Sequence, residues 1–340
     1  MSEPSKAFSR RAALGAAAGV TAAAALAGSA QAQPQHGRLT ANGRTYRIRR
    51  GAHQVVIAGV AATLLSWRVE GEELLLTHSA DEVGEGYQGK TILPWPNRID
   101  GGQYEFGGRK LQVPVNEPER NTALHGLMNF VEWDLVRHLP DRVELEHVLP
   151  PSYGYPFHLS FRITYAVDEQ GVTTTLTARN IGTEPAPYGT ANHTYIAAGT
   201  GRIDDMVLEL PAEAYYVTDD RLLPIDKRHV AGTEYDFRTA RRIGSTEMDT
   251  AFTALRRQPD GTAVTRFHRA DGRAIELWVD RAHGYLQVYT DDSPEADRPP
   301  RAGITVEPMT CAPNAFVTGD GLAVIEPGGT HRGRWGLRLR

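Results

Sequence analysis

The stretch that decides the fold class is FHLSFRITYAVDEQGVTTTLTARNIG, residues 157–182. Apolar residues alternate with more polar ones along two runs, and the turn sequence DEQG separates the runs. The alternating positions are Phe157, Leu159, Phe161, Ile163, Tyr165, Val172, Thr174, Leu176 and Ala178. A period of two places every second side chain on the same face of an extended chain. The stretch therefore predicts a β-hairpin with one buried face.

The same pattern recurs along the chain. YEFGGRKLQVP, residues 104–114, is a shorter hairpin pattern around Gly107 and Gly108, since glycine readily takes the positive φ of a tight turn. Further paired runs occur in residues 53–78, 143–149 and 274–292, whereas no stretch beyond residue 32 keeps a helical period for more than two turns. We therefore predict an all-β protein, a large antiparallel β-sandwich, with a single domain over residues 33–340.

The first 32 residues differ from the rest. Arg10 and Arg11 precede an Ala/Gly-rich apolar run that ends in the small-residue sequence Ala30-Gln31-Ala32. This pattern predicts a twin-arginine signal peptide over residues 1–32, and hence a periplasmic or secreted protein. The alternative, a membrane helix, fits less well because the run is short and a small-x-small cleavage site follows it. We expect contact with the membrane only transiently, during export.

Composition excludes one class of partner. The chain has 340 residues, of which 41% are hydrophobic and 23% charged, with a net charge of -4. No block of Lys and Arg is interleaved with aromatic residues, so nothing matches the phosphate backbone of a nucleic acid. We expect no nucleic-acid partner, and the sequence leaves the oligomeric state open.

Common catalytic motifs are missing. Cys311 is the only cysteine and has no histidine close by in sequence, which is typical of a buried packing residue. The serine-hydrolase pattern G-x-S-x-G is absent, as are H-x-x-x-H and HExxH. We therefore expect neither a cysteine or serine nucleophile, nor a metal, nor any other cofactor.

Two of the twelve histidines stand in contexts that could position an imidazole for chemistry. His125 lies in NTALHGLMNF, where Gly126 allows close backbone approach, and His193 lies in GTANHTYIAAG. Either histidine, taken alone, could equally be a packing residue held by one hydrogen bond. The sequence around them has to distinguish the two interpretations.

That surrounding sequence resembles the aldose 1-epimerases, or galactose mutarotases. The resemblance begins in residues 89–127, GKTILPWPNRIDGGQYEFGGRKLQVPVNEPERNTALHGL, where an N-R-I is followed by a glycine-containing hairpin and an L-H-G. It continues in the same order through ANHTY, STEMDTAF, LQVYT and VEPMTCAPNAF, which together with the first stretch span residues 89–316. Each motif alone is weak, but the ordered set is specific. It implies the galactose mutarotase-like supersandwich fold and an isomerase that acts on an aldose sugar.

The resemblance also implies roles for individual residues. Glu307 would be the general base and His193 the general acid. The residues that would bind the sugar hydroxyls are Asn97, Arg98, His125, Asp249 and Gln287. Interconversion of α and β anomers needs a base for the proton of the C1 hydroxyl and an acid for the ring oxygen, so a carboxylate and an imidazolium suffice without metal or nucleotide.

Several alternatives remain open at this stage. Arg98 could serve only as a structural ion pair, and Asp249 could cap a turn. The chain departs from the family pattern at Pro224-Ile225-Asp226 and at Ile196, which concerns substrate preference and leaves the acid and base in place.

The function has alternatives too. One is a non-catalytic periplasmic carbohydrate-binding module on the same fold. Another is a mutarotase for a phosphorylated sugar, which would need extra cations at the site. A third is a mutarotase for a sulfonated or acidic sugar, for which Arg241, Arg242 and Arg301 are the candidate cations. The aromatic residues that could stack on the sugar are Trp95, Tyr155 and Tyr195, each of which could instead belong to the core.

Overall fold

The computed structural model of the chain describes residues 39–293 and 299–340. The expected export signal, residues 1–32, lies outside the described residues. The described residues belong to one compact unit. None of the helices in the described part has the length and apolar character that a membrane crossing requires.

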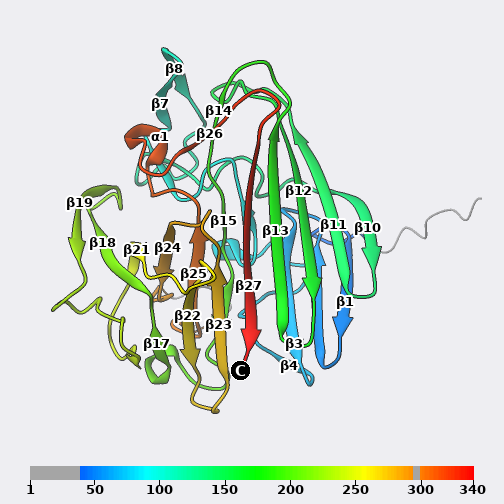
Figure 1. Cartoon of the computed structure of the whole chain (residues 1–340), viewed down its shortest axis with the longest axis vertical. Coiled ribbons are helices and arrows are strands. Elements are labelled where there is room, and N and C mark those ends of the chain that lie inside the picture. Colours follow the sequence, from blue (N-terminus) through cyan, green and yellow to red (C-terminus); the bar gives the residue numbers. More distant parts are fainter. Residues whose placement is uncertain (1–38, 294–298) are drawn as a thin grey trace, which may run out of the picture. The chain divides into compact units, whose positions relative to one another are not determined.

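The largest sheet has nine strands, which run from β10 to β20 in the order β10-β11-β12-β13-β27-β23-β22-β17-β20 (Figure 1). Their bounds are β10 Asp134–Leu139, β11 Arg142–Leu149, β12 Leu159–Val167, β13 Gly171–Asn180, β27 Thr330–Leu339, β23 Ala274–Val279, β22 Ala263–His268, β17 Val207–Glu209 and β20 Arg241–Arg242. Neighbouring strands of this sheet are antiparallel throughout. The predicted antiparallel, all-β architecture is therefore confirmed.

The decisive stretch forms β12 and β13, as predicted. The two strands pair from Leu159 opposite Asn180 to Val167 opposite Val172. Along β12 the predicted inward positions are buried and alternate with more exposed ones, and the same holds along β13. In the turn, the Asp168 carboxylate accepts hydrogen bonds from the backbone N–H groups of Gln170 and Gly171. The period of two in the sequence thus marks the buried face correctly.

Two further sheets complete the sandwich. A six-stranded sheet has the order β16 (Tyr195–Ala197), β25 (Gly303–Met309), β24 (Tyr285–Tyr289), β21 (Asp249–Leu255), β18 (Ala212–Thr218) and β19 (Pro224–His229). A four-stranded sheet has the order β1 (Thr45–Arg50), β2 (His53–Ala58), β3 (Thr63–Val69) and β4 (Glu72–Glu73).

Short strand pairs and short helices connect these sheets. The pairs are β5 (Thr91–Ile92) with β15 (Ala191–Asn192), β6 (Arg98–Asp100) with β9 (Thr122–Leu124), β7 (Gln103–Phe106) with β8 (Arg109–Gln112), and β14 (Ala186–Tyr188) with β26 (Ala323–Ile325). The helices of the described residues are α1 (Ala315–Thr318), η1 (Glu85–Tyr87) and η2 (Ile203–Asp205). The hairpin predicted around Gly107 and Gly108 is β7–β8, and both glycines have positive φ, at 58° and 72°.

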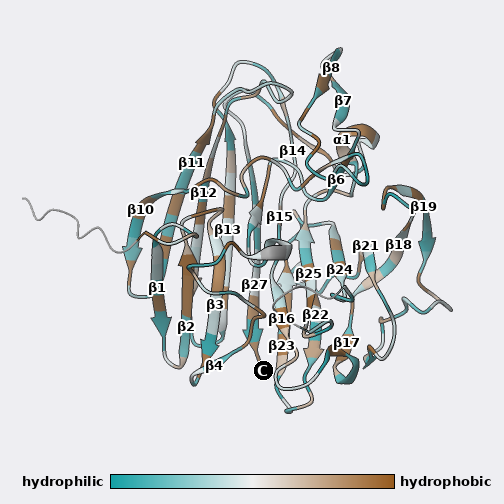
Figure 2. Ribbon diagram, turned by 180° about the vertical axis from the view of Figure 1, so that it is seen from behind, coloured by the Kyte–Doolittle hydropathy of each residue, from teal (hydrophilic) through white to brown (hydrophobic). Residues whose placement is uncertain are grey.

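One continuous apolar core joins the three large sheets. It includes Trp67 on β3, Phe161 on β12, Leu286 on β24 and Leu337 on β27. Figure 2 shows hydrophobic and hydrophilic residues alternating along β11. Burial of one face of each sheet against another is the main stabilising contribution in such a sandwich.

One expectation needs correction. Residues 274–292 read as a further strand pair, and they do form two consecutive strands, β23 and β24. These strands do not pair with each other: β23 lies between β22 and β27 in the large sheet, and β24 lies between β21 and β25 in the six-stranded sheet. The chain crosses from one layer of the sandwich to the other between them. Alternation in the sequence identifies a strand but does not name its partner.

Candidate active site

All seven residues predicted for the site line one cavity of about 290 Å³. They come from six places in the chain, namely the start of β6 with the residue before it, the turn after β9, the turn after β15, and the strands β21, β24 and β25. Among the described residues, the lining is Gly86, Tyr87, Asn97, Arg98, Arg120, Leu124, His125, His193, Tyr195, Asp249, Gln287, Tyr289, Ser293 and Glu307. The structure therefore brings together residues that lie up to 210 positions apart in sequence, from Asn97 to Glu307.

Three acidic or amide side chains come from adjacent strands of the six-stranded sheet. Gln287 on β24 is directly opposite Glu307 on β25. Asp249 begins β21, the strand on the other side of β24. The Gln287 amide donates to the Asp249 carboxylate with Nε2–Oδ1 at 2.5 Å. Cross-strand neighbours on one face of a sheet are held close together, so the pairing register itself sets the spacing of these groups.

Glu307 meets His193 across the cavity. His193 lies in the turn between β15 and β16, and its Nε2 is 3.4 Å from Glu307 Oε1. Both side chains are buried, with 9% and 2% of their surface exposed. Within the described residues the second carboxylate oxygen, Oε2, is buried and has no hydrogen-bond partner. The same is true of Gln287 Oε1. Both residues line the cavity, and a hydroxyl group bound there could satisfy these two acceptors.

His125 and Asn97 hold each other in place. The backbone N–H of His125 donates to the Asn97 carbonyl at 2.9 Å, and the backbone N–H of Asn97 donates to His125 Nδ1 at 3.2 Å. Both residues have left-handed backbone conformations, with φ of 62° and 54°. Such conformations cost about 1 kcal/mol or more for residues other than glycine and gather at functional sites. Because Nδ1 accepts a hydrogen bond, the neutral His125 ring carries its proton on Nε2.

Gly126, which follows His125, approaches another chain segment closely, as its context predicted. It forms a bridge with Leu93, and a Cβ at this position would lie 2.1 Å from the Leu93 carbonyl oxygen. Its φ of 74° is left-handed as well. Only glycine can satisfy both conditions.

A buried ion pair orients Arg98. The Glu117 carboxylate accepts two hydrogen bonds from Arg98, from Nε at 2.8 Å and from Nη2 at 2.9 Å. The Thr122 hydroxyl and the guanidinium of Arg120 also donate to Glu117. Burial opposes the charge on Glu117, but these donors outweigh it and hold the pKa of the carboxyl below its usual range. The structural ion pair considered for Arg98 is real, and the same guanidinium also lines the cavity.

Burial sets the protonation of the other groups. It raises the pKa of Glu307 well above its usual value, and the nearby Asp249 raises it further, while Arg98 opposes both. It raises the pKa of Asp249 as well, against Arg98 and Gln287. Burial lowers the pKa of His125 well below its usual value, helped by His193 and Arg98. His125 is therefore a neutral hydrogen-bonding group near pH 7, and Glu307 is a stronger base than an exposed carboxylate.

The aromatic candidates separate into two groups. Tyr195 lines the cavity and stacks on His193, with ring centroids 5.3 Å apart. Trp95 and Tyr155 belong to the core, where the Trp95 indole donates to the Ala123 carbonyl and the Tyr155 hydroxyl to the Pro187 carbonyl. Tyr87 also lines the cavity, with its ring 4.8 Å from that of His125.

Three residues near the cavity were missed by sequence reasoning. They are Tyr87, which touches both histidine rings, Arg120, which lines the cavity, and Glu117, which anchors Arg98. No local signal marks Tyr87. Glu117 and Arg120 fall inside the long N-R-I to L-H-G motif, and a search for the partner of a buried arginine could have singled out the glutamate.

The donor set also bears on metal binding. His125, His193 and Glu307 each offer a ligand atom, and these atoms lie within 4.8 Å of one another. Spacing along the chain did not reveal this cluster. A metal-bound histidine normally donates a hydrogen bond from its other ring nitrogen, whereas His125 accepts one there from Asn97. The cluster therefore fits hydrogen bonding to a substrate better than coordination of a metal.

Other candidate residues lie elsewhere. Arg241 stacks on Phe237, Arg242 pairs with Asp205, and Arg301 pairs with Asp204 and Asp292. None of these three arginines lines the cavity, so they do not supply the extra cations that an acidic sugar would need there. Cys311 is buried away from the cavity, and burial raises the pKa of its thiol far above the usual range. A cysteine nucleophile is not favoured.

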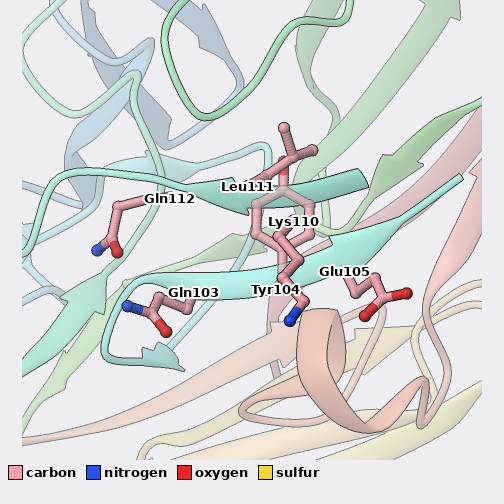
Figure 3. Close-up of a pocket in the computed structure, with 6 residues that line it drawn as sticks. All are labelled: Gln103, Tyr104, Glu105, Lys110, Leu111 and Gln112. Carbon is pink, nitrogen blue, oxygen red and sulfur yellow. The ribbon is translucent and has the colours of Figure 1, made fainter. Parts of the chain in front are cut away.

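A second hollow, of about 420 Å³, lies on the β7–β8 hairpin. Figure 3 shows its six lining residues, all from the two strands of the hairpin. They are Gln103, Tyr104, Glu105, Lys110, Leu111 and Gln112. Its single carboxylate has no second acid or imidazole in this lining to work with, so the hollow offers no acid and base pair.

Comparisons with known proteins agree on one family. The family model for aldose 1-epimerase matches residues 44–338. The chain is 32% identical to the uncharacterized protein YihR of Escherichia coli over 292 residues, which cover 86% of this chain and 92% of that protein. It is 28% identical to the galactose mutarotase of Mus musculus over 221 residues, which cover 60% of this chain and 62% of that protein.

Solved structures show the same fold. A GalM/aldose epimerase homologue from C. elegans superposes with a TM-score of 0.78 at 19% identity, covering 87% of this chain and 98% of that one. Galactose 1-epimerase from Lactobacillus acidophilus superposes with a TM-score of 0.72 at 21% identity, covering 85% and 91%. With the family match over nearly all the described residues and the galactose mutarotase-like fold, this chain belongs to the aldose 1-epimerase family.

Proposed function

We propose that this protein is a mutarotase that interconverts the α and β anomers of an aldose, with Glu307 as general base and His193 as general acid. The observation that carries the proposal is the 3.4 Å approach of His193 Nε2 to Glu307 Oε1. The ring oxygen and the C1 hydroxyl oxygen of an aldose are bonded to the same carbon. An acid and a base that serve these two oxygens must therefore converge on one point, as these two side chains do.

The reaction follows from that convergence. Glu307 takes the proton of the C1 hydroxyl while His193 donates a proton to the ring oxygen, so that the bond between C1 and the ring oxygen breaks and a C1 carbonyl forms. Rotation about the bond from C1 to C2 presents the other face of the carbonyl. Neutral His193 then takes back the proton of the C5 hydroxyl as that oxygen attacks C1, and protonated Glu307 returns its proton to the carbonyl oxygen. Both groups end as they began.

The remaining cavity residues suit the binding of sugar hydroxyls. Arg98 and His125 supply donors, while Asp249 and Gln287 Oε1 supply acceptors. Asn97 fixes the His125 ring so that its Nε2–H is available as the donor. A mixed set of donors and acceptors is what a polyhydroxylated ring requires, since each hydroxyl can both give and accept a hydrogen bond.

Polarimetry tests the proposal directly. The purified protein is added to freshly dissolved α-D-glucose and α-D-galactose, and the approach of optical rotation to equilibrium is compared with that in buffer. We expect a faster approach for at least one sugar, in proportion to protein concentration, and no acceleration by Glu307→Gln at the same concentration. Equal rates with and without the wild-type protein would contradict mutarotation of these neutral hexoses.

The alternatives have their own readouts. Calorimetric sugar binding by a protein that never accelerates mutarotation would favour the non-catalytic binding module. Acceleration of anomer exchange in glucuronic acid or glucose 6-phosphate, but not in neutral sugars, would favour the acidic or phosphorylated substrate. In that case the Arg120 guanidinium at the cavity is the group to examine, because it is about one-third exposed and lies beside Arg98.

The proposed export over residues 1–32 has a separate test. Fractionation of cells that express the full chain should recover the protein in the periplasm or medium, and replacement of Arg10 and Arg11 by lysine should retain it in the cytoplasm. Unchanged fractionation would contradict the twin-arginine assignment.

A further inference from the structure

Lys90 is a buried cation beside the proposed active site. Its side chain is almost fully inaccessible, with 2% of the residue's surface exposed. Within residues 39–293 and 299–340, no carboxylate lies within ion-pair distance of its ammonium group. The ammonium instead donates to the Asn129 carbonyl at 2.9 Å and lies 4.0 Å from the centroid of the Phe130 ring. Lysine is almost never buried without a carboxylate partner.

The contacts of Lys90 lead to both histidines of the cavity. On the His193 side, the backbone N–H of His193 donates to the Lys90 carbonyl at 3.0 Å. On the His125 side, the Asn129 backbone carbonyl accepts from the Lys90 ammonium, and the Asn129 side-chain amide donates to the His125 carbonyl at 2.8 Å. One residue thus links, through its backbone and its side chain, the two segments that carry the imidazoles.

The geometry at the end of these links is specific. The His125 and His193 rings meet edge to face, with centroids 5.2 Å apart and planes at 87°. Tyr87, whose carbonyl accepts the Lys90 backbone N–H, packs its ring against both. The ammonium is also 6.0 Å from the centroid of the Tyr87 ring.

We propose that Lys90 is a positioning residue that holds His125 in register with His193 through its hydrogen bond to Asn129. The proposal rests on the proposed function, because it holds that the relative placement of the His125 and His193 rings matters for catalysis. Lys90 is not among the residues that line the cavity. It acts on the reaction only through the placement of the two rings.

The cost of burying this cation supports the assignment. Burial lowers the pKa of the Lys90 ammonium to about 8. A methionine of similar length would fill the same space without a charge to desolvate. What the lysine adds over methionine is the hydrogen bond to Asn129 and the attraction to the Phe130 ring, and these are the contacts that hold the His125 segment.

A double-mutant cycle tests the link. Lys90→Met removes the ammonium, Asn129→Ala removes the side-chain bond to His125 while leaving Lys90 in place, and the double variant combines them. Lys110→Met, on the exposed face of the β7–β8 hairpin, is the matched control (Figure 3). We expect each single variant to lower kcat about 10- to 100-fold with KM within about threefold of wild type, since small displacements of groups that position the substrate for reaction have such effects.

The cycle has a clear expectation for coupling. If both changes break one chain of contacts, the kcat of the double variant should lie within about threefold of that of the single variant with the lower kcat. Losses that multiply, or a Lys90→Met variant with the wild-type kcat, would overturn the proposal. If Lys90→Met does not fold, Asn129→Ala carries the test alone, because its lysine and core are intact.

A readout that needs no turnover separates this proposal from the proposed function. Imidazole ¹⁵N and ¹H resonances of His125, assigned with a His125→Asn variant, report the ring environment in the sugar-free protein. We expect them to shift in Lys90→Met and in Asn129→Ala but not in Lys110→Met. Unchanged His125 resonances would overturn the positioning role. If the His125 resonances shift but the wild-type protein accelerates the mutarotation of no sugar, Lys90 still positions His125, and the mutarotase assignment is wrong.

Discussion

At the scale of single residues, burial and neighbouring charges set the protonation state of each polar group in the site. Glu307 is held in a wall with little access to water, which makes it a stronger base than an exposed glutamate. Arg98 stays charged because Glu117 pairs with it through two hydrogen bonds. His125, in contrast, stays neutral. Three polar groups around one cavity thus have three different protonation behaviours, each caused by its neighbours.

The acid and base assignment predicts large rate effects from conservative changes. Glu307→Gln and His193→Asn should each lower the rate of anomer interconversion about 10²- to 10⁴-fold, because each removes one partner of a proton transfer and leaves the shape of the cavity intact. The measurement is polarimetry on protein whose circular dichroism matches wild type. Cys311→Ser is the control and should keep the rate. Full activity in Glu307→Gln together with its loss in Cys311→Ser would show that the assignment is wrong.

Lys90 predicts a dependence of stability on pH. Its pKa is about 8 in the folded chain and 10.5 as a free side chain, so between these values the unfolded chain binds more protons at this position. The contribution of Lys90 to the free energy of unfolding therefore becomes more favourable as pH rises through this window. It is most unfavourable below the folded-state pKa of about 8. Relative to Lys90→Met, the free energy of unfolding of wild type should increase by about 2 to 3 kcal/mol from pH 7 to pH 10.

Urea denaturation of both proteins at several pH values measures this difference. Ionisation of other groups is common to the two chains and cancels in the comparison. A difference that stays constant from pH 7 to pH 10 would mean that Lys90 titrates normally, and hence that its ammonium reaches solvent.

At the scale of elements, the short β6–β9 pair determines where His125 and Arg98 lie. Arg98 is opposite Leu124, so Asn97 and His125 occupy adjacent ends of the two strands. The chain then turns away from the pair at Gly126, which touches the backbone of Leu93. A strand pair of three residues on each side has little stability of its own. Its contacts with neighbouring segments keep it formed.

Gly126→Ala should disrupt this element. The new Cβ would lie 2.1 Å from the Leu93 carbonyl oxygen in a left-handed conformation, so the backbone next to His125 must move. We expect a loss of about 3 kcal/mol or more in the free energy of unfolding, together with a loss of activity. The matched control is Gly107→Ala in the β7–β8 turn, where φ is 58° but no atom of the described residues lies within 4 Å of the new Cβ. That change should cost only about 1 to 2 kcal/mol and leave activity unchanged. Equal losses in the two variants, by urea denaturation, would contradict the close approach.

At the scale of the whole molecule, one core holds the three large sheets together. The same apolar cluster contains side chains from the nine-, six- and four-stranded sheets. The cavity lies where the edges of short strand pairs meet the six-stranded sheet, so its walls depend on the whole sandwich.

This continuity predicts that the described sandwich unfolds as one cooperative unit. Urea denaturation followed by near-ultraviolet circular dichroism, which reports the packed aromatic residues, should coincide with the far-ultraviolet curve, which reports the strands. Addition of a bound sugar should shift both curves together. Two separated transitions would show that one sheet unfolds independently of the others.

Much of the fold could be predicted from local pattern. Alternation along residues 157–182 gave β12 and β13 and their buried faces, because a strand exposes every second side chain to one side whatever its partner. The glycines at 107 and 108 gave the β7–β8 turn for the equally local reason of backbone freedom. The candidate residues were those implied by the family resemblance, and the family itself is shown by the match over residues 44–338.

What the sequence determined by itself was therefore the identity of strands, their buried faces and the residues named by the motifs. The three-dimensional contacts were needed to show that β23 and β24 join different sheets and that Glu117 anchors Arg98. They also showed that Tyr87 packs against both histidine rings and that Lys90 bonds to Asn129. Periodicity depends on each residue's own geometry and solvent exposure. Strand partners, ion pairs and the convergence of side chains depend on contacts between residues far apart in sequence, which no local pattern encodes.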